Sequence, residues 1–181
     1  MSIRQTNTKQ KITPFLWFDD KAEEAVNFYV SIFSASGGKK SSGSPQGGTK
    51  VMSTSRYDED GAKAAGRPAG SVMTVAFKLD GQDFTAINGG PIFKFTEAIS
   101  FAVNCKDQQE VDYFWDSLSA AGEPGQCGWL KDKYGLSWQI VPAILGELMS
   151  GTDPEKARRV MQAMLAMKKI DIEALERAHA G

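Results

Sequence analysis

The feature that most constrains the fold is a pattern of strand, glycine turn and strand near the middle of the chain, in residues 82–105. Phe84, Ala86 and their neighbours alternate with a period of two, as in a half-buried strand. Turn-forming residues at 88–91, Asn-Gly-Gly-Pro, then interrupt the alternation. An apolar run at 99–103, rich in strand formers, follows. We interpret this stretch as the join between two halves of one domain.

The predicted elements occur in the same order on both sides of this join. Before it, the periodicity predicts a strand, a helix and three strands, at residues 12–18, 22–33, 49–57, 71–79 and 82–88. After it, the pattern predicts a strand, a helix and short strands, at residues 98–103, 109–121, 125–131 and 136–141. We expect Asp19 or Asp20 to cap the first helix and Asp107 to cap the second. The repeated order predicts two modules of similar build.

The remaining segments are predicted as loops and tails. Residues 1–10 are polar and are expected to be disordered. Residues 34–48 and 58–70 are glycine-rich and are predicted as loops, and the first of them is either a lid or a solvated insertion. After Pro142 we expect a tail of three helical segments, at residues 143–149, from residue 154 onward, and at 170–178.

Composition and charge exclude several classes of function. The chain has 181 residues, a formal net charge of −1 and 41% hydrophobic residues, as in an ordinary globular protein. A net charge near zero gives no electrostatic basis for binding nucleic acid. No apolar run approaches the roughly 20 residues that span a bilayer, and the polar start does not resemble a signal peptide. We therefore expect a cytoplasmic protein of bacterial type, with no nucleic-acid or membrane partner.

The residues that commonly carry catalysis are scarce. The sole histidine, His179, lies two residues from the C-terminus, so serine–histidine and cysteine–histidine catalysis lose their usual base. Cys105 and Cys127 have no metal-type or redox-type spacing and are expected to be packing thiols. Residues 43–50, GSPQGGTK, have the wrong order for a phosphate loop. No dinucleotide fingerprint follows a predicted strand either.

Aromatic side chains are dense in the predicted strands, and two interpretations stay open. Core packing explains most of them, whereas a ligand pocket explains why polar side chains accompany them on strands, as in many small-molecule sites. The polar candidates are Asn88, Ser100 and Gln139, each of which must be either hydrogen-bonded within the protein or turned toward a ligand. Glu97 is either a candidate base or a solvated strand end.

Three stretches of this sequence resemble a known family. They are KITPFLWFDDKAEEAVNFYVSIF at residues 11–33, SVMTVAFKLDGQDFTAINGGPIFKFTEAISFAVNC at 71–105 and GQCGWLKDKYGLSWQIVP at 125–142. Together they are similar to the PhnB-like branch of the vicinal oxygen chelate (glyoxalase/bleomycin-resistance) superfamily, which is often labelled 3-demethylubiquinone-9 3-methyltransferase. The resemblance continues into the tail, through ARRVMQAMLAMKKIDIEALERA.

The resemblance implies an α+β fold of paired βαββ(β) modules, whose mixed sheets curl around a cleft that a homodimer usually completes. The glyoxalase-like domain is then expected at residues 11–142, with modules at about 11–90 and 97–142, and a helical tail at 143–181. Metal-using relatives carry ligands at positions that correspond here to Thr13–Pro14, Ile99–Ser100 and Gln139. Because none of these residues is a histidine or a carboxylate, we expect no metal and no other cofactor.

The sequence thus predicts a small-molecule-binding protein that holds an apolar or aromatic ligand in the cleft. The expected ligand-binding residues are Trp17, Asn88, Phe93, Phe95, Ser100, Trp129 and Gln139. The alternative is an enzyme of the same fold, a lyase, an isomerase or a transferase acting on a phenolic or quinone-like substrate, with Glu97 or Cys127 as the candidate catalytic group. A third hypothesis is an interaction role, with tail helices swapped between subunits.

Overall fold

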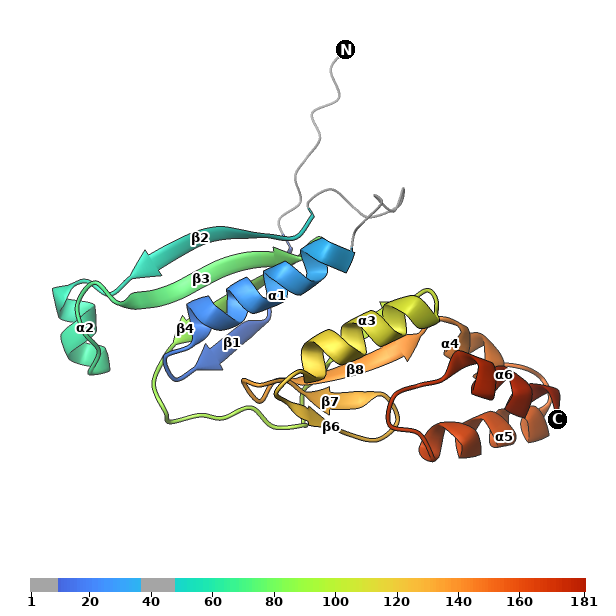
Figure 1. Cartoon of the computed structure of the whole chain (residues 1–181). Helices are drawn as coiled ribbons and strands as arrows, with labels where there is room; N and C mark the ends of the chain where they lie inside the picture. Colours follow the sequence, from blue (N-terminus) through green and yellow to red (C-terminus); the bar gives the residue numbers. More distant parts are fainter. Residues whose placement is uncertain (1–9, 37–47) are drawn as a thin grey trace, which may run out of the picture. The chain divides into compact units, whose positions relative to one another are not determined.

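The computed structural model describes residues 10–36 and 48–181. The chain divides into two compact units, Met1–Lys94 and Phe95–Gly181, and each is described here by itself. Each unit contains one four-stranded mixed sheet and a helix that follows its first strand (Figure 1). The predicted α+β class and the C-terminal helices are confirmed. The predicted disorder of residues 1–10 and most of the loop at 34–48 lie outside the described residues.

The first unit is built on a sheet in the order β1-β4-β3-β2. Its elements are β1 (Phe15–Phe18), α1 (Ala22–Ser36), β2 (Lys50–Arg56), α2 (Glu59–Ala65), β3 (Val72–Leu79) and β4 (Gln82–Asn88). Strand β1 runs parallel to β4, whereas β3 runs antiparallel to both β4 and β2. Residues Asp80 and Gly81 both have positive φ, 42° and 83°, as the predicted two-residue hairpin between β3 and β4 requires.

Helix α1 packs on one face of this sheet, against β2, β3 and β4 (Figure 1). The alternation of the strands puts Leu16, Phe77 and Phe84 on the helix side, where they are buried together with Val26 and Tyr29 of the helix. The helix therefore removes one face of the sheet from water and leaves the other face without a helix.

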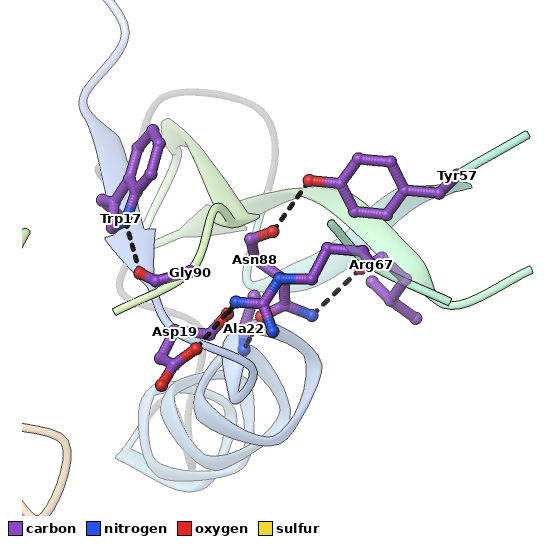
Figure 2. Close-up of polar contacts among 8 residues, drawn as sticks. Trp17, Asp19, Ala22, Tyr57, Arg67, Asn88 and Gly90 are labelled. Atoms are coloured by element: carbon purple, nitrogen blue, oxygen red, sulfur yellow. Dashed lines mark hydrogen bonds and ion pairs between the residues drawn. The ribbon is translucent and has the colours of Figure 1, made fainter. Parts of the chain in front are cut away.

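The start of α1 differs from the prediction. The backbone N–H of Ala22 donates to the side-chain oxygen of Asn88, at 2.7 Å, so the first turn is capped from strand β4. The carboxylate of Asp19 instead pairs with the Arg67 guanidinium, at 2.7 Å (Figure 2). The predicted cap from Asp19 is therefore wrong, and no cap by Asp20 is seen, because a distant amide reaches the orphan N–H. The helix also runs to Ser36, into the segment predicted as a loop.

The predicted loop at 58–70 contains the short helix α2. The side chain of Asp58 accepts a hydrogen bond from the backbone N–H of Gly61, at 2.7 Å, and Gly66 ends the helix with a positive φ of 64°. Ala62 is buried against the rest of the unit. Seven residues with one buried side chain give too little periodicity for sequence analysis to detect, so the caps and the tertiary contact decide the structure here.

The second unit repeats the plan with a sheet in the order β5-β8-β7-β6. Its first six elements are β5 (Phe101–Cys105), α3 (Gln108–Ser119), β6 (Glu123–Pro124), β7 (Trp129–Lys131), β8 (Ser137–Pro142) and α4 (Ile144–Met149). Strand β5 runs parallel to β8, and β7 runs antiparallel to β8. The predicted cap of α3 is confirmed, since the Asp107 side chain accepts from the N–H of Glu110 at 2.9 Å. The predicted single strand at 125–131 is wrong, because Cys127 and Gly128 adopt positive φ and break it.

The tail belongs to the second unit and packs on its own chain. Helices α5 (Pro154–Leu165) and α6 (Ile172–Ala180) form a small core with α4, centred on Val160, Ile170 and Leu175. The backbone N–H of Cys127 donates to the carbonyl of Met167, at 2.8 Å, and so joins the sheet to the turn between α5 and α6. No helix in the described ranges is long and apolar enough to cross a membrane.

We predict that Asn88→Ala destabilises the first unit by about 2–4 kcal/mol, because the change leaves the buried N–H of Ala22 and the carbonyl of Val72 without their partner. The measurement is the free energy of unfolding in urea. Asn104→Ala is the matched control, since Asn104 is also a strand asparagine but is exposed, and it should cost less than about 0.5 kcal/mol. Equal losses in both variants would contradict the structural role of Asn88.

Candidate functional site

Each sheet has one face turned toward its helix and a second face turned away from it, which we call the open face. On the helix side the strand residues are buried, whereas most residues of the open face are half-buried or exposed. The predicted site residues of the first unit are Trp17, Asn88 and Phe93. Those of the second unit are Phe95, Ser100, Trp129 and Gln139, together with Glu97 and Cys127.

In the first unit, Trp17 and Phe93 lie together on the open face. Their ring centroids are 5.1 Å apart, edge to face. The Trp17 indole N–H donates to the carbonyl of Gly90 at 2.9 Å (Figure 2). A Cβ at position 89 would lie 2.2 Å from the indole ring, so only glycine fits at Gly89. Phe93 is 62% exposed and leaves one edge of this aromatic pair open to a ligand.

Asn88 lies on the helix side of the same sheet and not on the open face. Its side-chain oxygen accepts from the N–H of Ala22, and its side-chain nitrogen donates to the carbonyl of Val72 at 3.1 Å. Its own carbonyl accepts from the hydroxyl of Tyr57 at 2.8 Å (Figure 2). Both polar atoms of the amide are engaged within the protein, so we assign Asn88 a structural role and leave it out of the candidate site.

In the second unit, the structure brings three predicted residues together on the open face. Trp129 and Gln139 are direct cross-strand neighbours on β7 and β8. The Gln139 amide nitrogen donates to the Ser100 hydroxyl at 2.8 Å, which places Ser100 on the same face, just before β5. Trp129 and Gln139 are half-buried. This group combines an aromatic ring with an amide and a hydroxyl, the composition of many small-molecule sites.

The carboxylate of Asp132 positions strand β8. It is 3% exposed and accepts from the backbone N–H groups of Tyr134 and Leu136, at 2.8 and 3.1 Å, and from the indole N–H of Trp138, at 2.9 Å. These bonds shape the turn from β7 to β8 and orient Trp138 toward the helix side. Because strand residues alternate, Ser137 and Gln139 must then lie on the open face.

Two further residues of this face, Lys131 and Ser137, were not predicted. They are cross-strand neighbours, one step along the strands from Trp129 and Gln139. Ser137 is fully buried, and its hydroxyl has no hydrogen-bond partner in the described part of the chain. The sequence did contain the signal for both, because each lies two residues from a predicted site residue on the same strand and so shares its face.

Glu97 reaches Lys131 from the segment that precedes β5. Its carboxylate lies 2.6 Å from the Lys131 ammonium, and the Glu97 side chain is 61% exposed. The hydrogen bond from Lys131 lowers the pKa of Glu97, with smaller contributions from a backbone hydrogen bond and the positive charge. The same hydrogen bond raises the pKa of Lys131. To act as a base, Glu97 would have to leave the ammonium that holds it in its ionised form.

The two remaining predicted residues lie outside this group. Phe95 is half-buried in the same segment as Glu97. Cys127 lies in the turn between β6 and β7 with a positive φ of 56°, and its backbone N–H bonds to the tail. Its catalytic role remains a prediction.

The positions where metal-using relatives carry ligands do not fit a divalent ion. Ser100 and Gln139 are neutral and are hydrogen-bonded to each other. Pro14 has no ligating side chain, and Ile99 is an apolar residue, 71% exposed. Within residues 10–36 and 48–181, no group of three or more histidine, cysteine or acidic side chains is arranged to hold a metal. We therefore derive no step through a metal.

Comparison with known proteins shows the family to which this chain belongs. The family model for 3-demethylubiquinone-9 3-methyltransferase matches residues 10–141. The chain belongs to this PhnB-like family. A solved structure of a PhnB protein from Bacillus cereus is 38% identical, with 74% of this chain and 100% of that chain covered and a TM-score of 0.58. No curated protein matches the chain.

A second solved structure, of a protein from Pseudomonas aeruginosa, is 15% identical. The match covers 74% of this chain and 98% of that chain, with a TM-score of 0.54. At this identity the likeness concerns the fold alone. The matched residues of the family model contain both sheets and both of their helices, α1 and α3, so the PhnB-like part of the chain includes both open faces.

We predict that only one of the two thiols of this PhnB-like chain reacts with Ellman's reagent at pH 8. Burial raises the pKa of Cys105 to about 12, with smaller contributions from Glu110 and Asp107, so its thiolate is scarce in the native state. The half-buried Cys127 should react, and both should react in urea. Without urea, the Cys127→Ser variant should therefore not react with Ellman's reagent. A rapid reaction of that variant would show that Cys105 is accessible.

Proposed function

We propose that this PhnB-like chain is a small-molecule-binding protein that holds an aromatic or other apolar ligand against the open face of its second sheet. The observation that carries the proposal is the group of Trp129, Gln139 and Ser100. An aromatic ring and a hydrogen-bonded amide–hydroxyl pair lie side by side there, on a face turned away from the helix. These three side chains can hold a ligand by ring contact and hydrogen bonds, without a metal.

The chemistry of the group suits a flat ligand. Burial of an aromatic side chain such as Trp129 against a ligand is worth roughly 1.5–3 kcal/mol. The bond to Ser100 uses one N–H of the Gln139 amide, and among the described residues nothing engages its side-chain oxygen. That oxygen and the second N–H can orient a polar substituent of the ligand. In the first unit, Trp17 and the exposed edge of Phe93 offer a second aromatic surface.

The resemblance to the vicinal oxygen chelate superfamily supports the same proposal and extends it. In that superfamily paired modules curl around a cleft that a homodimer completes. We accordingly propose a homodimer in a bacterial cytoplasm.

The second candidate function is catalysis, which the description of the family favours because it names a methyl transfer to a quinone precursor. In this chain Glu97 and Cys127 are the candidate groups. If Glu97 were the base, Glu97→Gln would lower turnover of a quinone-like substrate by at least tenfold, and Cys127→Ser would do the same if the thiol were the nucleophile. Unchanged turnover in both variants would remove the assignment.

We predict that quinone-like and other aromatic compounds quench the tryptophan fluorescence saturably, and that Trp129→Ala weakens the binding by about tenfold or more, or roughly 1.4 kcal/mol. Gln139→Ala should weaken binding as well, because it removes the amide of the same group. Gln109→Ala is the matched control, since Gln109 is exposed on α3, on the other side of the sheet. An absent saturable response, or equal affinities in Trp129→Ala and wild type, would overturn the proposal.

A further inference from the structure

The hydroxyl of Ser137 is the feature of the second unit that the proposed function leaves unexplained. The side chain is fully buried, yet no described residue bonds to its hydroxyl. A buried polar atom without a partner is costly, and proteins usually satisfy such atoms with a protein group, a water or a ligand. Ser137 shares its face of the sheet with Gln139, two residues along β8, so the unsatisfied hydroxyl lies beneath the face where we place the ligand.

The neighbours of Ser137 on the open face are a cation and several hydrogen-bonding side chains. Lys131 is its direct cross-strand partner on β7, and their Cβ atoms are therefore about 5 Å apart. The hydrogen bond from Gln139 to Ser100 lies on the other side of Ser137, toward β5. One ammonium, two hydroxyls and an amide thus lie together, and Trp129 adjoins them one step along the strand. Lys131 carries the positive charge of this group, and the carboxylates near it are Glu97 and Glu123, its cross-strand neighbour on β6.

The protein already places a carboxylate at this ammonium. Glu97 lies 2.6 Å from the nitrogen of Lys131, but it comes from a segment outside the strands and its side chain is 61% exposed. An ion pair with so exposed a partner is weak, because water screens the two charges. An external carboxylate can therefore exchange with Glu97 at small cost. Glu97 shows where such a group would bind.

We propose that the ligand of the second sheet is an aromatic acid, whose carboxylate replaces Glu97 at Lys131 and accepts a hydrogen bond from Ser137. Its ring lies against Trp129, and the Gln139–Ser100 pair holds the remaining carboxylate oxygen or a ring substituent. Because Ser137 is fully buried in the free chain, binding requires the side chains that cover it to move aside. The inference rests on the proposed function and adds the charge of the ligand and the residues that select it.

The test compares two probes of the same shape, 2-naphthoate and the neutral 2-naphthamide, by isothermal titration calorimetry of the full chain at pH 7.5. We expect 2-naphthoate to bind at least tenfold more tightly. Lys131→Met should abolish this preference, whereas Glu97→Gln should raise the affinity for 2-naphthoate several-fold and leave 2-naphthamide unchanged. Unfolding of a variant lowers its affinity, so the increase expected for Glu97→Gln could not result from a loss of folding.

Two further variants sharpen the test. Ser137→Ala should weaken 2-naphthoate binding several-fold without lowering Tm, because it removes a hydroxyl that has no partner in the free protein. Lys106→Met is the matched control, since Lys106 also forms a surface ion pair in this unit, with Glu110 at 2.8 Å, and should leave both affinities unchanged.

The outcomes separate the inference from the function on which it rests. Equal binding of both probes in the wild type, with Trp129→Ala weakening both, would overturn the acid selectivity and leave the aromatic site standing. A preference for 2-naphthoate that survives Lys131→Met would overturn the assignment of the ammonium. An absence of saturable binding of either probe would overturn both proposals.

Discussion

The first unit depends on the buried amide of Asn88. A helix that begins over a sheet has backbone N–H groups that water cannot reach, and each needs a partner. The Asn88 side chain supplies one to Ala22 and at the same time donates to Val72 on strand β3. One side chain thus joins the helix to two strands of the sheet. It also accounts for a polar residue at the end of an otherwise apolar face.

The second unit solves a related problem with a carboxylate. Asp132 accepts three hydrogen bonds, two from its own turn and one from the indole of Trp138. Buried charges are tolerated when several donors surround them. Because these bonds direct Trp138 to the helix side, the neighbours of Trp138 on β8 are directed to the open face. The polar network of the turn therefore decides which side chains are available to a ligand.

The open faces of the two units carry different kinds of side chain. In the first unit the open face carries an aromatic pair, Trp17 and Phe93, and in the second it carries a tryptophan beside an amide, hydroxyls and an ammonium. Two of the positions that the resemblance assigns to metal ligands hold a serine and a glutamine that are hydrogen-bonded to each other. We propose that such a face binds a small molecule through shape, hydrogen bonds and charge, with Lys131 supplying the charge.

Sequence by itself determined the larger plan. Strand and helix periods, the turn at Asp80–Gly81 and the cap at Asp107 are local, because each depends on residues a few positions apart. The structure confirms the turn and the cap, and it corrects the strand predicted at 125–131. The sequence also indicated Trp129, Ser100 and Gln139 as candidate residues, but only the strand pairing shows that they share a face. Only the tertiary structure decided which face the helix covers. The partner of Ala22 lies 66 residues away, so no local pattern could show that Asn88 is structural, or that Ser137 is buried without a partner beside Lys131.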